Sequence, residues 1–246
     1  MLGSIFSHGQ NHYGQVILTP ETLAAIATAP ETIEEMLSFH HLLASDEYVQ
    51  YVDAYYREGV RRFGRHWRYM DISSVLYSAA KLLQPKTYLE IGVRRGRSAC
   101  MVARGCPSVN VVAFDMWIPN YAGIENPGAE FVQRELIKHG HTGAVSFVNG
   151  DSHQTVPAFF QQNPQMFFDL ITVDGDHSEV GALDDLCTVI PRLAIGGIIV
   201  FDDIAHPSHS YLLHSWRRAI SAFPSLSGYE FTESGFGVAF AIRRSA

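Results

Sequence analysis

Three ionisable side chains follow a strongly apolar run near the middle of the chain. The stretch FFDLITVDGDHSEV, residues 167–180, places Asp174, Asp176 and His177 directly after the apolar residues. An Asp–Gly pair is ordinary turn chemistry, so a turn alone would explain Asp174 and the glycine after it. A carboxylate and an imidazole three residues apart can also bind a cation or move a proton. The other strand ends decide between these interpretations.

Acidic residues also close the other apolar runs that we predict to be strands. These runs are TYLEIG (87–92), VNVVAFD (109–115), AVSFVNGD (144–151), FFDLITVD (167–174) and GGIIVFDD (196–203). Glu90 lies inside the first run, and the others end in Asp115, Asp151, Asp174, and Asp202 with Asp203. In an open parallel α/β sheet the carboxyl ends of the strands meet at the edge where ligands bind. Like charges gathered there cost stability unless a cation is near, so this edge is predicted to be a binding site.

The loop after the first predicted strand discriminates between nucleotide cofactors. In EIGVRRGRSAC, residues 90–100, Gly92 and Gly96 form a G-x-x-x-G pattern. Dinucleotide sites use G-x-G-x-x-G, so nicotinamide cofactors are disfavoured. A glycine loop between strand and helix still permits close approach of a ligand, and Ser98 is expected to cap the helix that follows. Asp115, at the end of the second strand, is placed to accept both hydroxyls of a ribose.

The elements that must position these residues form an α/β pattern. Near-continuous apolar runs alternating with helical segments predict a doubly wound, mostly parallel sheet covered on both faces. The tail GYEFTESGFGVAFAIRR, residues 228–244, predicts an antiparallel hairpin at one edge with a turn at Ser234–Gly235. Helical signals without a reliable strand occupy residues 1–70, with prolines at the helix starts Pro20 and Pro30. We therefore predict a helical N-terminal cap at 1–70 and an α/β domain at 71–246, which begins with a helix at 71–85.

Composition narrows the classes of partner. The chain has 246 residues, 47% hydrophobic and 17% charged, with a formal net charge of -7, which is typical of a globular protein that does not bind nucleic acid. The basic stretch at 57–68 is interpreted as the end of a helix. Three cysteines without metal or redox spacing indicate reduced thiols and a cytoplasmic location. No secretory signal or membrane span is expected, because the N-terminus lacks a signal pattern and the longest apolar run, 193–201, is too short.

Five motifs together resemble the class I S-adenosylmethionine-dependent methyltransferases. They are YLEIGVRRGRSA, VVAFDMW, VNGDSHQTV, VDGDHSEVGALDDL and GGIIVFDDI, and the resemblance covers about residues 70–246. More narrowly, the order of the DGDHS and GGIIVFDD motifs is similar to the metal-dependent O-methyltransferases, which include catechol-type and antibiotic-sugar enzymes. The resemblance implies a Rossmann-like, seven-stranded sheet and S-adenosylmethionine as cofactor. It assigns Glu90, Gly92 and Gly96 to the methionine portion and sulfonium, Asp115 and Met116 to the ribose, and Asp151 and Ser152 to the adenine, with Ser98 counted among the cofactor residues.

The same resemblance assigns a metal site and a base. Asp174, Asp202 and Asp203 would hold Mg²⁺ or another divalent cation, which prefers oxygen ligands and can lower the pKa of a hydroxyl. His177 stands where this branch carries its general base, although its spacing alone would also fit a cap of the helix that begins near Ser178. Many relatives with phenolic acceptors carry Lys at this position. The histidine therefore favours a sugar or aliphatic hydroxyl as acceptor.

Other acidic and histidine side chains near these motifs have weaker assignments. Asp176 could replace Asp174 as a ligand, but a structural role at the start of the next helix is favoured. Asp184 and Asp185 are expected on a solvated helix face. The remaining candidates are His206, His209 and His214, which have zinc-like spacing but no nearby cysteine. We expect their loop to flank the acceptor pocket, with Trp216 packed behind it, and we expect loop 117–128 to contribute to acceptor recognition as well.

The sequence therefore predicts a methyltransferase that moves a methyl group from S-adenosylmethionine to a hydroxyl of a small molecule with the help of a divalent cation. Two alternatives remain. One is a related oxidoreductase or hydroxylase-associated protein that uses the same cleft, which the glycine spacing disfavours. The other is a non-catalytic binding protein that retains the cofactor cleft, which the full set of acids and His177 disfavours. The aromatic residues of the N-terminal cap suggest a homo-oligomer.

Overall fold

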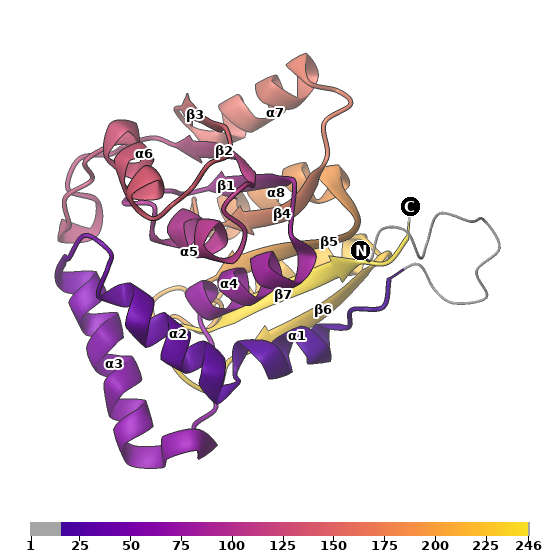
Figure 1. Cartoon of the computed structure of the whole chain (residues 1–246). Helices are drawn as coiled ribbons and strands as arrows, with labels where there is room; N and C mark the ends of the chain where they lie inside the picture. The colour runs from indigo at the N-terminus through magenta and orange to yellow at the C-terminus, as the bar shows by residue number, and fades with distance from the viewer. Residues whose placement is uncertain (1–15, 246) are drawn as a thin grey trace.

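The structure, a computed structural model, describes residues 16–245 and is built around one seven-stranded sheet (Figure 1). The strand order is β3-β2-β1-β4-β5-β7-β6. The strands are β1 (Thr87–Ile91), β2 (Asn110–Asp115), β3 (Val145–Asn149), β4 (Phe168–Val173), β5 (Leu193–Asp202), β6 (Leu226–Phe231) and β7 (Val238–Arg243). The first five pair in parallel, and β7 pairs antiparallel with both β5 and β6. The predicted doubly wound, mostly parallel sheet with an antiparallel C-terminal hairpin is confirmed.

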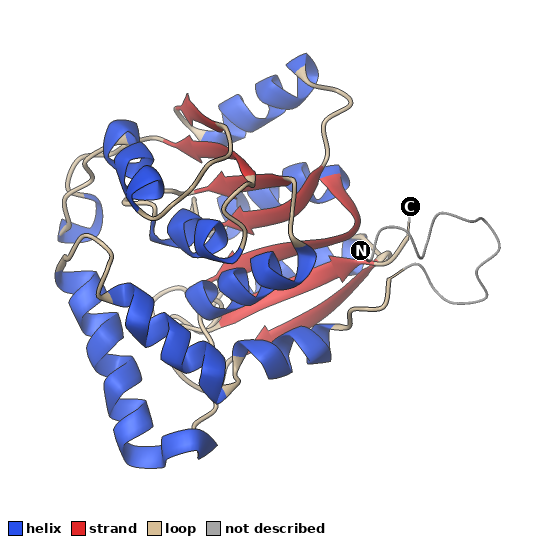
Figure 2. Cartoon of the chain, viewed as in Figure 1, coloured by secondary structure: helices blue, strands red, loops and turns tan. Residues whose placement is uncertain are grey.

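Helices cover both faces of the sheet (Figure 2). One face carries α4 (Ile72–Leu83), α5 (Arg97–Gly105) and α6 (Ala129–Lys138), and the other carries α7 (Ser152–Gln162), α8 (Glu179–Val189) and α9 (Leu212–Ala222). Short 3₁₀ turns lie at Tyr121–Gly123 and Ile190–Arg192. Each layer buries its own apolar cluster against the sheet. This explains why the central strands are apolar on both faces rather than alternating.

From residue 16 on, the N-terminal segment is mainly helical, as its prolines predict, and residues 1–15 of the predicted cap lie outside the described residues. It consists of α1 (Pro20–Ala27), α2 (Pro30–His40) and α3 (Glu47–Phe63), followed by a 3₁₀ turn at Gly64–His66. Thr19 caps α1 through its side chain, and Asp46 caps α3 in the same way. Leu23 of α1 and Met36 of α2 belong to the same apolar cluster as Phe240 of β7. The N-terminal helices therefore share a core with the sheet, and the division at residue 70 stays a prediction.

The start of the fifth strand and the place of the C-terminal hairpin in the sheet differ from those expected. β5 begins at Leu193 rather than at residue 196, because the chain continues in the sheet through an irregularity opposite Phe168–Leu170. Gly196 has a φ of +82° there, a conformation that favours glycine. In the C-terminal hairpin only β6 lies at the edge, while β7 is inserted between β5 and β6. The predicted turn at Ser234–Gly235 falls in the segment that joins them.

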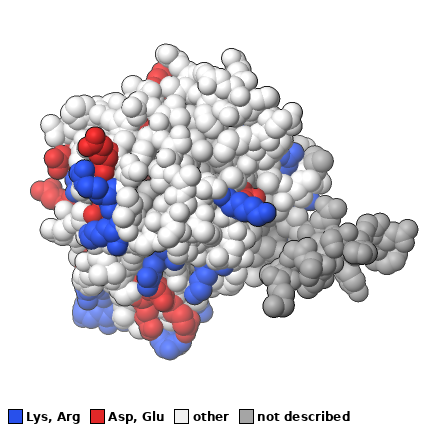
Figure 3. All heavy atoms as spheres, turned by 45° about the horizontal axis from the view of Figure 1, so that its top comes forward, with Lys and Arg blue, Asp and Glu red and all other residues white. Residues whose placement is uncertain are grey.

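On the face drawn in Figure 3, acidic and basic side chains lie in small mixed groups separated by large uncharged areas. Several ion pairs of the chain lie within one helix, such as those of Arg61 and Arg62 with Glu58 on α3. Ion pairs of this kind are worth little to stability. Among the described residues, no helix is both long enough and apolar enough to cross a membrane.

Candidate active site

A cavity of about 620 Å³ opens at the carboxyl edge of the parallel strands. Cavities of this size hold small organic ligands. Ten of the predicted site residues line it: Gly92, Ser98, Asp115, Met116, Asp151, Ser152, Asp174, His177, Asp202 and Asp203. Glu90 and Gly96 do not, although they belong to the same loop and strand. The cavity therefore brings the predicted cofactor, metal and base residues to one place.

The two glycines of the first loop are explained by close packing. Gly92 has a φ of +85°, and a Cβ there would lie 1.9 Å from the carbonyl oxygen of Asp174. Gly96 has a φ of +71°, and its Cβ would lie 2.5 Å from Val132 of α6. Only glycine lets the loop pass this close to the end of β4 on one side and to α6 on the other. The loop thereby brings the backbone after β1 against the turn that carries Asp174.

Glu90 lies behind the wall of the cavity and is fully buried. The Ser98 hydroxyl donates a hydrogen bond to Glu90 Oε1, while Glu90 Oε2 has no partner among the described residues. Burial raises the pKa of Glu90 to about 8, against the opposing effect of the Ser98 hydrogen bond. The expectation that Ser98 caps α5 is wrong. Gly96 occupies the N-cap position, and no side chain bonds to the cap of this helix.

Asp115 ends β2 and is held by backbone amides. Its Oδ2 accepts hydrogen bonds from the N–H groups of Val93 (2.8 Å) and Arg94 (2.7 Å), and its Oδ1 accepts one from Trp117 (2.5 Å). A carboxylate offers about four lone-pair positions, so the two oxygens retain capacity for a further donor. Met116 is 57% exposed and lines the cavity beside it. Asp115 thus fixes the glycine loop and also faces the space for a ligand.

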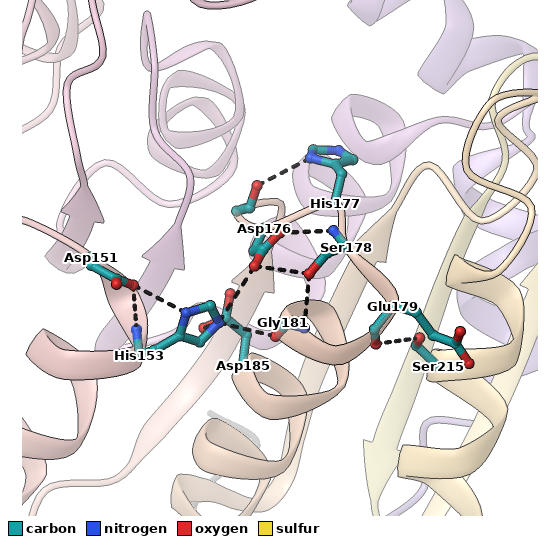
Figure 4. A network of polar contacts seen from close by, with 10 residues as sticks. Asp151, His153, Asp176, His177, Ser178, Glu179, Gly181, Asp185 and Ser215 are labelled. Atoms are coloured by element: carbon teal, nitrogen blue, oxygen red, sulfur yellow. Dashed lines mark hydrogen bonds and ion pairs between the residues drawn. The ribbon is translucent and has the colours of Figure 1, made fainter.

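Asp151 and Ser152 form the start of α7, where Asp151 is the N-cap and accepts from the His153 N–H at 3.0 Å. His153 then connects this helix to the start of α8 (Figure 4). Its Nδ1 lies 3.1 Å from Asp151, and its Nε2 lies 3.8 Å from Asp176 and 3.7 Å from Asp185. Asp185 is only 2% exposed, so the expectation of a solvated face for this residue is wrong. Its carboxylate lies behind Gly175, next to the turn that carries Asp174 and His177.

Asp174, His177 and Asp203 form a compact cluster in the wall of the cavity. One potential ligand atom from each lies within 4.8 Å of the others. His177 Nε2 is 3.2 Å from Asp203 Oδ2 and 3.5 Å from Asp174 Oδ1, and its Nδ1 is 3.1 Å from the carbonyl of Gly175. Asp203 has a φ of +61°, which is uncommon for Asp and occurs at strained functional positions. Asp202 lies in the same wall but outside this group.

The electrostatics of the cluster reflect crowded carboxylates. Burial raises the pKa of Asp174 to about 7; His177 opposes this shift and Asp203 adds to it. Burial and the charges of Asp203 and Asp174 hold the pKa of Asp202 well above its usual range. Burial disfavours the charged form of His177, but the Asp203 hydrogen bond and the Asp174 charge outweigh it and raise the pKa to about 9. A cation would relieve this repulsion, so the residues present fit a divalent ion with oxygen ligands.

The structure also shows where the other acidic and histidine side chains considered in the sequence lie. Asp176 accepts from the Ser178 N–H (2.7 Å) and hydroxyl (3.1 Å), so it organises the start of α8, as favoured. The rings of His206 and His209 stack at 4.6 Å and line the cavity, whereas His214 is exposed on α9 and does not line it. The three histidines therefore do not form one zinc site. Trp216 is buried behind this loop and stacks on Phe201 at 6.0 Å.

Sequence reasoning missed the arginines and tyrosines of the cavity. Arg94 and Arg97 of the glycine loop line it, and both act on the charge of Asp174. Tyr48 of α3 and Tyr121 of the 117–128 loop line it as well, and the latter places that loop at the cavity as expected. Three arginines within four positions, Arg94, Arg95 and Arg97, could have indicated that acidic side chains lie nearby. The acid that each arginine contacts depends on the fold.

Comparison with known proteins agrees with this geometry. Residues 89–204 match the model of a family described as a methyltransferase domain. Structural similarity extends over most of the chain: the O-methyltransferase from Bacillus cereus in complex with S-adenosylhomocysteine is 17% identical, with 87% of this chain and 90% of that chain covered and a TM-score of 0.55. The O-methyltransferase TomG from Streptomyces achromogenes, in complex with S-adenosylmethionine, is 18% identical, with 83% and 92% covered and a TM-score of 0.56.

The calicheamicin methyltransferase CalS11 is 20% identical, with 96% of this chain and 98% of that chain covered and a TM-score of 0.52. No curated protein matches the sequence. At these identities the solved structures establish the fold, and the family model establishes a methyltransferase domain between β1 and the end of β5. The predicted class I methyltransferase is confirmed.

Proposed function

We propose that the protein is an S-adenosylmethionine-dependent O-methyltransferase that uses Mg²⁺ or another divalent cation and acts on a hydroxyl of a small molecule. The observation that carries the proposal is the cluster of Asp174, His177 and Asp203 in the wall of a cavity that also contains Asp115 and Asp151. Solved neighbours described as O-methyltransferases, two of them bound to S-adenosylmethionine or S-adenosylhomocysteine, support the oxygen acceptor and the cofactor.

The cavity residues divide the work between cofactor and acceptor. Asp115 and Met116 would hold the ribose, and Asp151 and Ser152 the adenine, leaving Gly92 beside the methionine portion. Bound there, S-adenosylmethionine supplies an activated methyl group. Glu90 and Gly96 support this loop from behind, since neither faces the cavity.

On the acceptor side, the carboxylates of Asp174 and Asp203, with Asp202 as a further candidate, would hold the divalent cation. Such an ion, when bound, acts as a Lewis acid that lowers the pKa of a hydroxyl. His177 Nε2 is placed to take the proton of the acceptor hydroxyl. The charges of Asp174 and Asp203 keep His177 protonated when no cation is bound. His177 can therefore accept a proton only when these two carboxylates bind the cation. The neutral imidazole then points at the same space as the ligand atoms of the acids.

A sugar or other natural-product hydroxyl is the favoured acceptor. His177 in place of the Lys common among phenol-methylating relatives supports this, as does the similarity to CalS11, which is described as a TDP-rhamnose 3'-O-methyltransferase. We also propose a cytoplasmic location, which the three free cysteines support. We also propose that the protein forms a homo-oligomer through its N-terminal helices and that it binds neither nucleic acid nor a membrane.

The test begins with calorimetric titration of S-adenosylhomocysteine into the purified protein, where we expect micromolar affinity. Methyl transfer to a panel of hydroxylated acceptors should then require a divalent cation and stop in excess chelator. Asp174→Asn and Asp203→Asn should lower turnover at least about 100-fold, and His177→Gln about 10²–10⁴-fold, because each removes a group that acts on the reacting oxygen.

Affinity for S-adenosylhomocysteine should stay within a few fold in all three variants. His214→Gln, an exposed histidine outside the cavity, is the matched control and should keep full activity. Full turnover of Asp174→Asn in chelator would refute the metal mechanism. Absence of cofactor binding by the unaltered protein would refute the methyltransferase itself.

A further inference from the structure

The three arginines of the glycine loop are used differently. Arg95 forms an ion pair with Asp46, the N-cap of α3, at 2.9 Å, lies 3.4 Å from Glu125, and stacks on Phe131 at 4.7 Å. Arg97 lies over the ring of Tyr48 at 4.4 Å, donates to its hydroxyl at 3.4 Å, and is close to the charges of Asp71 and Asp202. Arg95 is thus accounted for by neighbours within the protein, whereas Arg97 keeps one buried nitrogen, Nη1, without an acceptor.

Arg94 has neither an ion pair like that of Arg95 nor an aromatic contact as close as that of Arg97. Within residues 16–245 its guanidinium forms no ion pair, and the only hydrogen bond of its side chain is a long one, 3.4 Å, from Nη2 to the carbonyl of Tyr121. Its Nε is buried without an acceptor. The side chain nevertheless lines the cavity. A buried guanidinium N–H without an acceptor is costly, and it is expected to find one when the cavity is filled.

The position of Arg94 is fixed in advance. Its φ of +53° is left-handed, and its N–H is held by Asp115 Oδ2 at 2.7 Å. The guanidinium lies over two aromatic rings, 5.9 Å from the centroid of Tyr48 and 5.9 Å from that of Tyr121. Arginine over aromatic faces keeps its planar fork of donors available for carboxylate or phosphate. Because the group is already ordered, little freedom is lost when an anion binds.

We propose that Arg94 binds an anionic group, a carboxylate or a phosphate, carried by the methyl acceptor. This inference rests on the proposed methyltransferase function and deepens it, because it assigns a charge to the substrate class. Two sources of such an anion exist, the acceptor and the amino-acid carboxylate of the cofactor. The acceptor is favoured because the two rings, Tyr48 and Tyr121, belong to α3 and to the 117–128 loop. Neither of these elements carries a cofactor residue of the proposed site.

Arg94 is also near enough to Asp174 for its charge to act on that carboxylate. An acceptor that presents its hydroxyl to Asp174, His177 and Asp203 would therefore reach Arg94 with a second group. The cation site and Arg94 would then hold the acceptor at two points. Two-point binding of this kind fixes the orientation of a hydroxyl toward the methyl donor. Neutral acceptors would lose one of these two contacts.

The experiment compares acceptors that differ only in charge. Calorimetric titrations use dihydroxybenzoate against the dihydroxybenzamide of the same ring pattern, and dTDP-rhamnose against methyl rhamnoside, all with S-adenosylhomocysteine and Mg²⁺ present. At least one anionic member should bind the unaltered protein about tenfold or more tightly than its neutral partner, as expected for a charged hydrogen bond. Arg94→Gln should reduce this preference to about twofold or less, and Arg94→Lys should restore part of it.

Arg134→Gln is the matched control, since it removes the same charge from an exposed part of α6, and it should keep the preference. Equal preference in the unaltered protein and Arg94→Gln would overturn the proposal. So would a loss of S-adenosylhomocysteine affinity in Arg94→Gln with acceptor preference intact, which would assign Arg94 to the cofactor carboxylate. Failure of every anionic probe to bind, while S-adenosylhomocysteine binds, would also overturn it and leave the methyltransferase proposal standing.

Discussion

Glu90 is an ionisable residue with no exposure to solvent, one hydrogen bond from Ser98, and one unpartnered oxygen. A buried carboxyl in this situation favours its neutral form. Burial raises its pKa from 4.5 to about 8, and the charge of Asp174 adds to the shift. The residue that resembles a cofactor ligand in the sequence is thus a neutral acid behind the cavity at moderate pH. This has a measurable consequence for stability.

Between about pH 4.5 and 8 the folded protein holds a proton on Glu90 that the unfolded chain has lost. The free energy of unfolding should therefore fall as pH rises through this window, with a contribution from Glu90 on the order of 1 kcal/mol per pH unit. Glu90→Gln removes the contribution. In urea unfolding at pH 5 and pH 8, we expect the variant to gain stability relative to the unaltered protein as pH increases.

Other buried acids, such as Asp202, titrate in both proteins and cancel in this difference. Glu130→Gln, an exposed change on α6, should leave the pH dependence unaltered and serves as the control. Parallel curves for Glu90→Gln and the unaltered protein would mean that Glu90 is ionised in the folded state throughout this range.

At the scale of elements, the turn after β1 and the turn after β4 are packed against each other at Gly92. Gly92→Ala adds a methyl group 1.9 Å from the Asp174 carbonyl at a φ of +85°. Backbone strain and overlap together should lower the free energy of unfolding by about 2–5 kcal/mol. Chemical denaturation measures the loss.

Gly140 offers a control with the same backbone and a different neighbourhood. Its φ is also +85°, but nothing lies within 4 Å of an added Cβ. Gly140→Ala should therefore show the strain alone, about 1–3 kcal/mol. Equal losses in the two variants would contradict the close approach of the two turns.

The elements themselves were predictable because buried parallel strands leave long apolar runs, and the five runs were found in the right order. The site edge followed, since the acids at Asp115, Asp174 and Asp202 mark where those runs end. The start of β5 at Leu193 was missed because the strand was predicted to begin at the first of two glycines, Gly196. The sequence does not show that a strand continues through an irregular pairing, because the irregularity depends on the neighbouring strand.

The details of the site could not be predicted, because they depend on contacts between distant elements. Asp185 reads as a solvated helix residue until α8 is packed against the start of α7, where His153 reaches it. Arg94 and Arg95 are adjacent in the sequence, and only the position of α3 shows that Asp46 pairs with Arg95. Spacing within a motif contains no information on either contact.

At the scale of the whole molecule, the N-terminal helices complete both the core and the site. Leu23, Met36 and Phe39 are buried in the apolar cluster that includes α4 and β7. Tyr48 of α3 and Asp46, the N-cap of that helix, line the cavity. Asp46 also forms an ion pair with Arg95 of the glycine loop. A cap that is joined to the sheet in this way should unfold together with it. The expectation for this chain is therefore a single cooperative transition, as in two-state unfolding.

Met36→Ala tests this coupling, because Met36 is fully buried in α2 and lies far along the chain from the sheet. The cavity should lower the free energy of unfolding by about 2–5 kcal/mol. Fluorescence of Trp216, in a background where Trp67 and Trp117 are replaced by Phe, reports on the apolar cluster of the opposite face. We expect the transition seen at Trp216 to shift by the same amount as the transition in far-ultraviolet circular dichroism.

Ile137→Ala, on an exposed position of α6, should change stability by less than about 0.5 kcal/mol and controls for the loss of an aliphatic side chain as such. An early transition in circular dichroism that leaves Trp216 unaffected would show that the N-terminal helices unfold as a separate cap. Coincident shifts would instead mean that the tyrosines and arginines of the cavity are positioned by the stability of the whole chain. Substitutions in α1 and α2 would then weaken acceptor binding through global unfolding, with no contact to the acceptor.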